Sequence, residues 1–575
     1  MHRTSTSTEA LPDTAVAVTQ KPATWRNMPN KWQLIVIAAA RITELLSERS
    51  QATYMFYQLQ SFAPPGEVSD SQAVSQAGVL MASWAAAQSI VAVWWGRAAN
   101  SPRLGRKGVL LIGLAGTAVS GLGSGFAQSF NQLLLLKVIA GGLNTNLGIM
   151  RTMIGETTEP RFESKAFLLL PMCLNIGDVL GPLLGGFLAD PSVSDSSEAT
   201  TSNDSSNNSD SSWMSRFPFA LPNFICALVI LISALMVAFG LDETHPSLTR
   251  NGRDRCREMG RWIFKKLWTS GVGRGRYERL ARGDDEELAS ISMLPEPYPS
   301  SGEGNLGRVS LDSTSSSTVT VVTQPTSQFQ NNTILPRVMT WRVGLTLLTH
   351  FTLMLHLSAF NTITPSFLST QRAGTTQNYL NLHLAGGLGL SLYQVGLAVA
   401  VLGLIGLSFQ LLVYPIITSK ISSYMSYRMF LPFSALAYFF LPFIVLLRKD
   451  SWVLWPVLLL LFGFQAVSRT FAQPGMIILI NSCGSHPHLR STIHGMGLSV
   501  GSLARILGPI GSGWALRIGL ERNMVGGIWW CMAFAVALKP KTPKDPKPLG
   551  CPRSSDVVVH LLVYKTDLIQ IPSFA

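Results

Sequence analysis

Long apolar segments recur along this chain of 575 residues, and they restrict its fold more than any other feature. A helix needs roughly 20 mostly apolar residues to cross a bilayer. About twelve blocks meet this criterion, so we expect an all-α membrane protein with about twelve transmembrane helices. The predicted spans are 33–62, 76–95, 109–128, 132–153, 166–189, 217–241, 342–367, 392–417, 429–447, 453–480, 492–518 and 523–538.

Two of these blocks carry related sequences. Residues 177–186 read GDVLGPLLGG, and residues 504–513 read ARILGPIGSG. Gly and Pro destabilise the interior of a soluble helix, but membrane helices tolerate them because neighbouring groups satisfy the freed backbone. A Gly-Pro helix that recurs in both halves of a membrane protein indicates an internally duplicated transporter.

The distribution of charge excludes a nucleic-acid partner, although the net charge is +13. Lys and Arg concentrate in the loops after the second, fourth and sixth spans, whereas residues 63–75 and 128–131 contain neither. This alternation follows the positive-inside rule of membrane proteins. It predicts that both termini and the central loop are cytoplasmic, with Arg448 and Lys449 as exceptions on the predicted outer side.

Composition divides the chain into five predicted segments. The polar termini and the central Ser/Thr-rich basic linker lack the apolar surface that folding requires, so we expect them to be disordered and cytoplasmic. The segments are an N-terminal tail 1–30, a six-helix bundle 31–241, the linker 242–338, a second six-helix bundle 339–538 and a C-terminal tail 539–575. Sequons at Asn203 and Asn207 in a predicted outer loop suggest a glycoprotein.

The last span is the weakest prediction because it offers only about sixteen apolar residues, fewer than a bilayer requires. A Pro/Lys tract follows it directly. Two interpretations fit: a short helix whose Lys539 reaches up to the headgroups, or an aberrant C-terminal sequence.

The loop after the second span reads WGRAANSPRLGRK over residues 95–107. It resembles the Gly-x-x-x-Asp-Arg-x-Gly-Arg-Arg signature of the major facilitator superfamily. In that family the acidic residue joins a charge relay with a neighbouring helix end and stabilises one conformation, a role that Asn can fill only through hydrogen bonding. The matching residues are Gly96, Arg103, Gly105, Arg106 and Lys107, with Asn100 at the acidic position and Ser101-Pro102 as an insertion.

The first Gly-Pro segment resembles the Gly-Pro motif of the antiporter branch of the same superfamily. Small residues allow helices to approach closely, so generic helix packing is the competing interpretation. The motif comprises Gly177, Gly181, Pro182, Gly185 and Gly186, and Gly508 and Pro509 repeat its centre. The resemblance covers nearly all of 33–538 and is strongest to fungal members related to zinc-induced-facilitator-like proteins and twelve-span drug–proton antiporters. It implies two pseudo-symmetric six-helix bundles around a central cavity, alternating access and no cofactor.

Charged residues inside spans are energetically costly and usually functional. In the first span, Arg41, Glu44 and Glu48 share one helix face. Burial favours the neutral form of a carboxyl group, whereas an adjacent arginine favours the ionised form. The hypothesis is that Glu44 or Glu48 binds and releases a proton with Arg41 as counter-charge; the alternative is a static ion pair.

Asp178 and Arg505 stand three residues before their Gly-Pro pairs and are therefore equivalent positions with opposite charge. The family fold places their helices on opposite sides of the inter-bundle interface, so direct pairing is not expected. Asp178 is a candidate second proton carrier or substrate counter-ion, and Arg469 is a further candidate deep in the tenth span. Arg151, at the end of the fourth span, fits a cytoplasmic anchor.

These observations predict a monomeric, proton-coupled secondary transporter of a small molecule, with export or antiport favoured, in the plasma or vacuolar membrane. A transporter-like nutrient sensor is the alternative. An enzyme or an ATP-driven pump is not expected, because no catalytic constellation or phosphate-binding loop is visible. No metal site is predicted either: His350 and His356 are six residues apart, and the histidines at 486, 488 and 494 lack completing ligands.

Overall fold

The computed structural model describes most of the predicted membrane-spanning part of the chain. The described residues are 27–62, 69–159, 162–189, 217–245, 248, 340–372, 384–448, 451–483 and 487–538. Within them, nine helices are long and apolar enough to cross a membrane. The predicted tails, both outer-loop sequons and most of the predicted linker lie outside the described residues.

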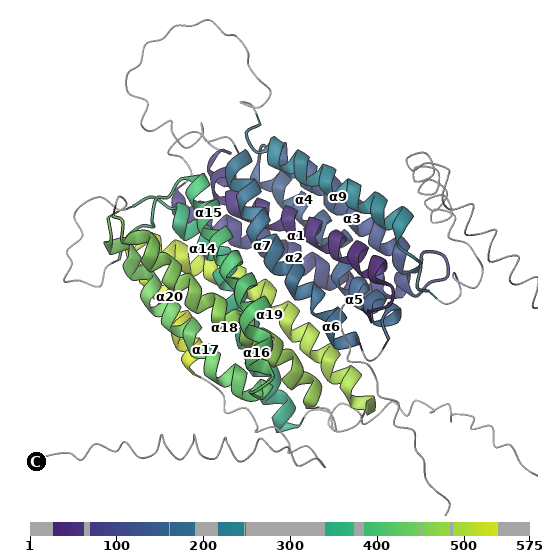
Figure 1. Ribbon diagram of the computed structural model, residues 1–575. Coiled ribbons are helices and arrows are strands. Elements are labelled where there is room, and N and C mark those ends of the chain that lie inside the picture. The colour runs from purple at the N-terminus through teal and green to yellow at the C-terminus, as the bar shows by residue number, and fades with distance from the viewer. Residues whose placement is uncertain are drawn as a thin grey trace, which may run out of the picture.

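The described residues of the first half form helices at all six predicted spans, and two of these spans are broken (Figure 1). The predicted fourth span consists of α4 and α5, separated at Asn144-Thr145, and the fifth consists of α6 and α7. The helices are α1 (Lys31–Gln60), α2 (Asp70–Ala99), α3 (Gly105–Gly125), α4 (Phe130–Leu143), α5 (Asn146–Thr157), α6 (Glu163–Phe167), α7 (Leu169–Leu188) and α9 (Ala220–Gly240).

The second half repeats this plan. Its second span continues through a π-helical turn, η3, and its third ends in a 3-10 turn, η4. The elements are α14 (Trp341–Ser369), α15 (Leu392–Ser408), η3 (Phe409–Val413), α16 (Tyr414–Thr418), α17 (Ser423–Phe440), η4 (Leu441–Leu446), α18 (Leu454–Ser482), α19 (Pro487–Glu521) and α20 (Gly526–Ala537).

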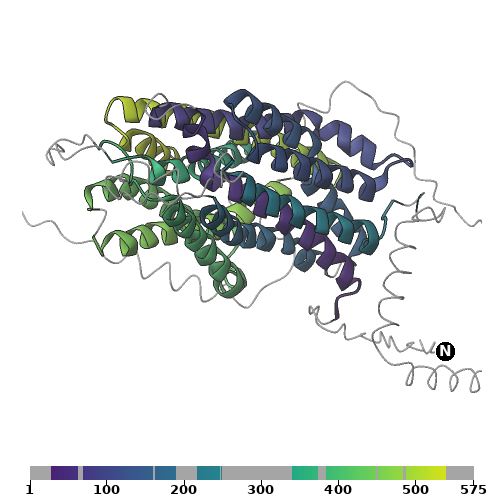
Figure 2. The same ribbon diagram turned by 90° about the horizontal axis from the view of Figure 1, so that it is seen from above.

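Helix packing follows the same pattern in both halves, which confirms the expected pair of matched six-span bundles. Helix α1 packs on α7 as α14 packs on α19, α2 on α4 as α15 on α18, and α3 on α9 as α17 on α20. The two bundles lie side by side in Figure 1, purple to teal beside green to yellow, and Figure 2 shows the same division from above. Contacts of α2 with α19 and of α7 with α15 join them.

The two Gly-Pro motifs occupy equivalent places in these joining contacts. The carbonyl oxygen of Pro182 faces Gly396 of α15, where an added Cβ would lie 2.6 Å away. The carbonyl oxygen of Pro509 faces Gly78 of α2, where an added Cβ would lie 2.5 Å away. Only glycine at these two positions allows the bundles to approach this closely. The two copies of the Gly-Pro motif therefore form equivalent contacts on the two sides of the interface.

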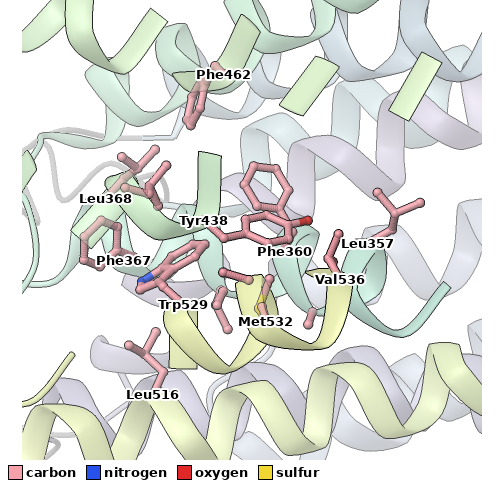
Figure 3. Close-up of a cluster of buried hydrophobic side chains, with 14 of the residues drawn as sticks. Leu357, Phe360, Phe367, Leu368, Tyr438, Phe462, Leu516, Trp529, Met532 and Val536 are labelled. Atoms are coloured by element: carbon pink, nitrogen blue, oxygen red, sulfur yellow. The ribbon is translucent and has the colours of Figure 1, made fainter. Parts of the chain in front are cut away.

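Helix α20 has only 12 residues, yet it supplies the centre of an aromatic core (Figure 3). The Trp529 side chain is fully buried, with its ring centroid 5.4 Å from that of Phe367 and 6.2 Å from that of Phe360. The last span is thus short and fully part of the second bundle. The tail after it lies outside the described residues.

Candidate functional site

The polar face of α1 forms a buried ion pair inside the first bundle. Arg41 donates a hydrogen bond to Glu44 over 3.1 Å, and Asn146 at the start of α5 donates to the other oxygen of the same carboxylate. Glu44 is 3% exposed. The break between α4 and α5 therefore brings to Glu44 a partner 102 residues away, one that the α1 sequence alone does not reveal.

Glu48 differs from Glu44 because it forms no hydrogen bond or ion pair with any described residue. It lines a cavity between α1, α2, α3 and α4 together with Arg41, Glu44 and Lys137. The volume of this cavity is about 50 Å³, enough for a few water molecules. Glu48 is thus a carboxylate at the wall of a cavity large enough to hold water.

A hydrogen-bonded chain crosses the first bundle beside this cavity. The Lys137 ammonium donates to Gln51 over 2.5 Å, and Gln51 donates to Asn223 of α9 over 2.9 Å. All three side chains are buried. These hydrogen bonds join α4, α1 and α9. The Lys137 ammonium at the cavity wall is thus held by the neutral side chain of Gln51.

Asp178 lies between two arginines from different bundles. One carboxylate oxygen is 2.8 Å from Arg49 Nε of α1, and the other accepts a hydrogen bond from Arg469 of α18 over 2.5 Å. The carboxylate is nearly buried, with Asp178 6% exposed. In the sequence Asp178 and Arg469 are separate candidates, whereas Arg49 emerges as a site residue only from the structure. Arg505, the repeat equivalent of Asp178, instead donates to Ser502 over 3.2 Å.

A second cavity lies between α7, α16 and α18, in the half of the protein predicted to face the cytoplasm. The volume of this cavity is about 60 Å³, and Arg469 and Asn175 line its wall. Asn175 also donates a hydrogen bond to Gln410 of the opposite bundle. Arg469, the partner of Asp178, therefore borders this cavity.

The opposite, predicted outer end of the interface is closed by hydrogen bonds between the bundles. The Tyr57 hydroxyl donates to the Leu390 carbonyl over 2.6 Å, and the Gln371 backbone N–H donates to Asp70 over 2.9 Å. The Phe187 and Tyr393 rings meet edge to face at 4.8 Å. These described contacts close the interface toward the predicted outside, and a cross-bundle cavity lies on the predicted cytoplasmic side.

The Gly-Pro motif of the first bundle faces two neighbours. Gly177, Gly181 and Gly185 lie against α1, where added Cβ atoms would meet Leu45, Arg49 and Ser50 within 2.6 Å. Gly186 faces Gly396 of the other bundle, and Gly508 packs against α14. The motif thus joins α1 to the bundle interface, and Arg49 is at the point of contact.

The signature loop after α2 receives its acidic partner from another span. The Glu243 carboxylate accepts hydrogen bonds from the backbone N–H groups of Arg106 and Lys107 at the start of α3, both 3.1 Å. Gly105 has φ +67°, a conformation that glycine adopts readily. The Asn100 carbonyl contacts His245 Nε2 at 3.0 Å, whereas Gly96 and Arg103 are exposed. Asp242–His245, assigned to the linker, therefore belong to the folded part.

A buried polar cluster in the second bundle was not anticipated from the sequence. The Tyr438 hydroxyl contacts His356 Nδ1 at 2.9 Å and accepts a hydrogen bond from Gln465 over 2.9 Å. No regular spacing links these three residues, which come from α14, α17 and α18. Within the described part of the chain, no three His, Cys, Asp or Glu side chains group as a metal site would require.

Two matched bundles of membrane-spanning helices, with charges buried at their interface, define a multi-pass membrane protein of the transporter class. The chain belongs to the Major Facilitator Superfamily, whose family model matches residues 52–509. This confirms the resemblance drawn from the signature loop and the Gly-Pro motif.

The chain is similar to proteins named for drug transport or drug resistance, and its fold is similar to that of a sugar symporter. The chain is 28% identical to the major facilitator superfamily multidrug transporter mfsB of Aspergillus fumigatus, over 88% of this chain and 81% of that protein. It is 29% identical to the class B tetracycline resistance protein of Escherichia coli, over 31% of this chain and 36% of that one. The crystal structure of a D-xylose–proton symporter shares the fold, with TM-score 0.55 and 14% identity over 89% of this chain and 98% of the symporter.

Proposed function

We propose that this protein is a proton-coupled secondary transporter that exports a small molecule by alternating access. The observation that carries the proposal is Glu48, a carboxylate without a described partner at the wall of a water-sized cavity between membrane helices. A carboxylate in this setting can exchange a proton when water reaches it and can become neutral when water is excluded.

The surrounding charges support a division of roles within α1. Glu44 is held by Arg41 and Asn146, as expected for a structural pair that orients the helix. Glu48 lies within electrostatic reach of Lys137, Arg49 and Arg505, cations from both bundles. Protonation of Glu48 would change the balance of charge across the interface. A proton shifts a conformational equilibrium only when it binds the two conformations with different affinity, and this change of charge supplies such a difference.

The Asp178 bridge supplies a contact that alternating access must break. It joins α7 of one bundle to α18 of the other, next to the cavity on the predicted cytoplasmic side. Rocking of the bundles that widens this side separates the carboxylate from Arg469. Export is favoured because the multidrug transporter and the tetracycline resistance protein are named for resistance or drug transport.

Reconstitution of the full chain into proteoliposomes tests the proposal. Tetracycline, chosen from the name of one relative, serves as first probe, and an imposed pH gradient serves as driving force. We expect flux that accelerates with the gradient and collapses when a protonophore removes it. Flux that ignores the gradient contradicts proton coupling, and the absence of flux for every compound in a panel of drugs, sugars and organic acids contradicts transport.

A further inference from the structure

Gln465 of α18 carries a buried amide group of which only one end is hydrogen-bonded. The amide nitrogen donates to the Tyr438 hydroxyl over 2.9 Å, whereas the amide oxygen has no hydrogen-bond partner among the described residues. Gln465 is 1% exposed. Burial of an amide oxygen without a hydrogen bond costs free energy, so such an atom in a folded protein requires an explanation.

The Tyr438 side chain fixes the direction of this amide group. Its ring is fully buried and packs beside the rings of Phe360 and Trp529, with centroid distances of 5.7 and 6.3 Å (Figure 3). Its hydroxyl also contacts His356 Nδ1 at 2.9 Å. Because this hydroxyl is held in place and binds the amide nitrogen of Gln465, the amide oxygen is directed away from Tyr438.

Gln465 lines a small cavity between the two bundles, enclosed by α7, α14, α15 and α18. The volume of this cavity is about 10 Å³, room for a single water-sized group. It shares Asn175, Arg469 and Thr470 with the wall of the larger cavity on the predicted cytoplasmic side, so the two cavities adjoin. Gln465 therefore places an unsatisfied hydrogen-bond acceptor at the inner end of a cross-bundle cavity.

The surroundings of this acceptor limit the chemistry of a ligand. Two guanidinium groups, those of Arg49 and Arg469, share the single carboxylate of Asp178, and Arg469 belongs to the cavity wall. This arrangement repels a cationic hydrogen-bond donor but not an uncharged hydroxyl or N–H group. Much of the remaining wall is apolar and suits an apolar or aromatic body, with Phe360, Leu402, Gly403, Gly406 and Ala466 as lining residues.

We propose that the side-chain oxygen of Gln465 accepts a hydrogen bond from an uncharged O–H or N–H group of the transported compound, which carries this donor on an apolar or aromatic body. Tyr438 is a positioning residue, because it determines which end of the Gln465 amide group is available to the ligand. The inference rests on the proposed function for transport, whereas ligand binding to Gln465 can be measured without it.

Pairs of ligands that differ in one donor group test the proposal. The probes are 7-hydroxy-4-methylcoumarin and 7-amino-4-methylcoumarin, and the 7-methoxy and 7-dimethylamino compounds are their donor-free twins. Binding to the full-length protein in detergent is measured by equilibrium dialysis, with partition into empty micelles subtracted and under mildly acidic conditions that keep the hydroxyl group protonated. We expect at least one donor-bearing probe to bind about three- to tenfold more tightly than its twin, the effect of one uncharged hydrogen bond.

Variants assign this preference to Gln465. Gln465→Met removes the amide group and should abolish the preference for the donor-bearing probe. Gln72→Met, at an exposed glutamine of α2, is the matched control and should keep the wild-type preference. If Gln465→Met does not fold, Gln465→Asn retains an amide group, withdraws its oxygen by one methylene and should also lose the preference.

Tyr438→Phe tests the positioning role. It keeps the ring in the aromatic core but frees the Gln465 amide group, so it should reduce the ratio of the two affinities within a pair. A merely structural defect would weaken the binding of both twins alike and leave their ratio unchanged. An unchanged ratio in Tyr438→Phe would therefore contradict the positioning role.

Three results would overturn the inference: no binding of either donor-bearing probe, equal affinity within both pairs, or a preference that persists in Gln465→Met. Displacement of the hydroxycoumarin by the cation benzylammonium would contradict the uncharged class. A preference that depends on Gln465, without flux of the probe in proteoliposomes, would contradict transport and leave the binding role of Gln465 intact. Gradient-driven flux of tetracycline without any donor preference would do the reverse.

Discussion

Asp178 of α7 and Arg469 of α18 form an ion pair across the bundle interface, with 2.5 Å between carboxylate oxygen and guanidinium nitrogen. Arg49 of α1 holds the other carboxylate oxygen at 2.8 Å. The carboxylate is nearly buried, and Gly403 of α15 lies against its backbone. One acidic residue within the Gly-Pro segment therefore connects three helices of two bundles, and its removal should affect both stability and the bundle movement.

The first prediction concerns this pair. Asp178→Asn leaves two partly buried arginines without a counter-charge, and it should destabilise the protein by roughly 3–5 kcal/mol. The double variant Asp178→Asn/Arg469→Gln removes one unpaired charge, so its loss should be smaller than the sum of the single losses. Thermal unfolding of the detergent-purified proteins measures both quantities. Glu521→Gln, at an exposed ion pair, is the matched control and should change little. Additive single losses would show that Asp178 and Arg469 are not coupled.

The second prediction separates the two glutamates of α1. Glu48→Gln should abolish acceleration of transport by a pH gradient, because it removes the carboxylate at the cavity wall. Glu44→Gln should lower thermal stability, since Glu44 is bound by Arg41 and Asn146. The flux that remains in this variant should still accelerate with the pH gradient. The measurement is flux into proteoliposomes with and without a gradient. A full gradient response in Glu48→Gln would exclude Glu48 as the carrier.

The third prediction concerns the repeated interface. An added methyl group at Gly78 or Gly396 meets a proline carbonyl of the opposite bundle, so Gly78→Ala and Gly396→Ala should push the bundles apart and slow transport. The two substitutions should act alike because their sites are equivalent. Gly511→Ala adds the same methyl group on α19 with no heavy atom within 4 Å and provides the control. Wild-type flux and stability in both interface variants would show that the close approach is not required.

The fourth prediction tests whether the short helix α20 stabilises the second bundle. Trp529→Ala removes the ring at the centre of the aromatic core and should cost about 3–5 kcal/mol of stability. Trp514→Ala, at a tryptophan that is 62% exposed, should have a much smaller effect. Thermal unfolding distinguishes the two variants. Equal losses for both would mean that α20 contributes little to the bundle.

The fifth prediction concerns the start of α3. Glu243→Gln keeps the shape of the side chain but removes the negative charge at a helix N-terminus, which should lower stability by about 1 kcal/mol. Glu163→Gln, at an exposed glutamate of α6, serves as comparison. Thermal unfolding at low and high salt measures the difference, which should shrink at high salt. A difference that does not respond to salt would point to packing instead of charge.

The sequence determined the membrane spans, their duplication and the identity of the family. Apolar length is a local property, so nine described helices meet the criterion directly, and the structure adds breaks such as that at Asn144-Thr145 and the full length of α19. The Gly-Pro repeat is likewise local, and it correctly indicated two matched halves. The pairing of Arg41 with Glu44 also followed from helical spacing within one segment.

Tertiary structure alone decided which charges meet. Asp178 and Arg469 are 291 residues apart in the sequence, yet they form a hydrogen-bonded ion pair across the bundle interface. Similarly, Glu243 reaches α3 from the end of the sixth span. These contacts depend on the rotation of each helix about its axis and on how two bundles dock. A one-dimensional pattern of apolar residues does not specify either quantity, because a lipid-facing and a partner-facing side of a membrane helix can be equally apolar.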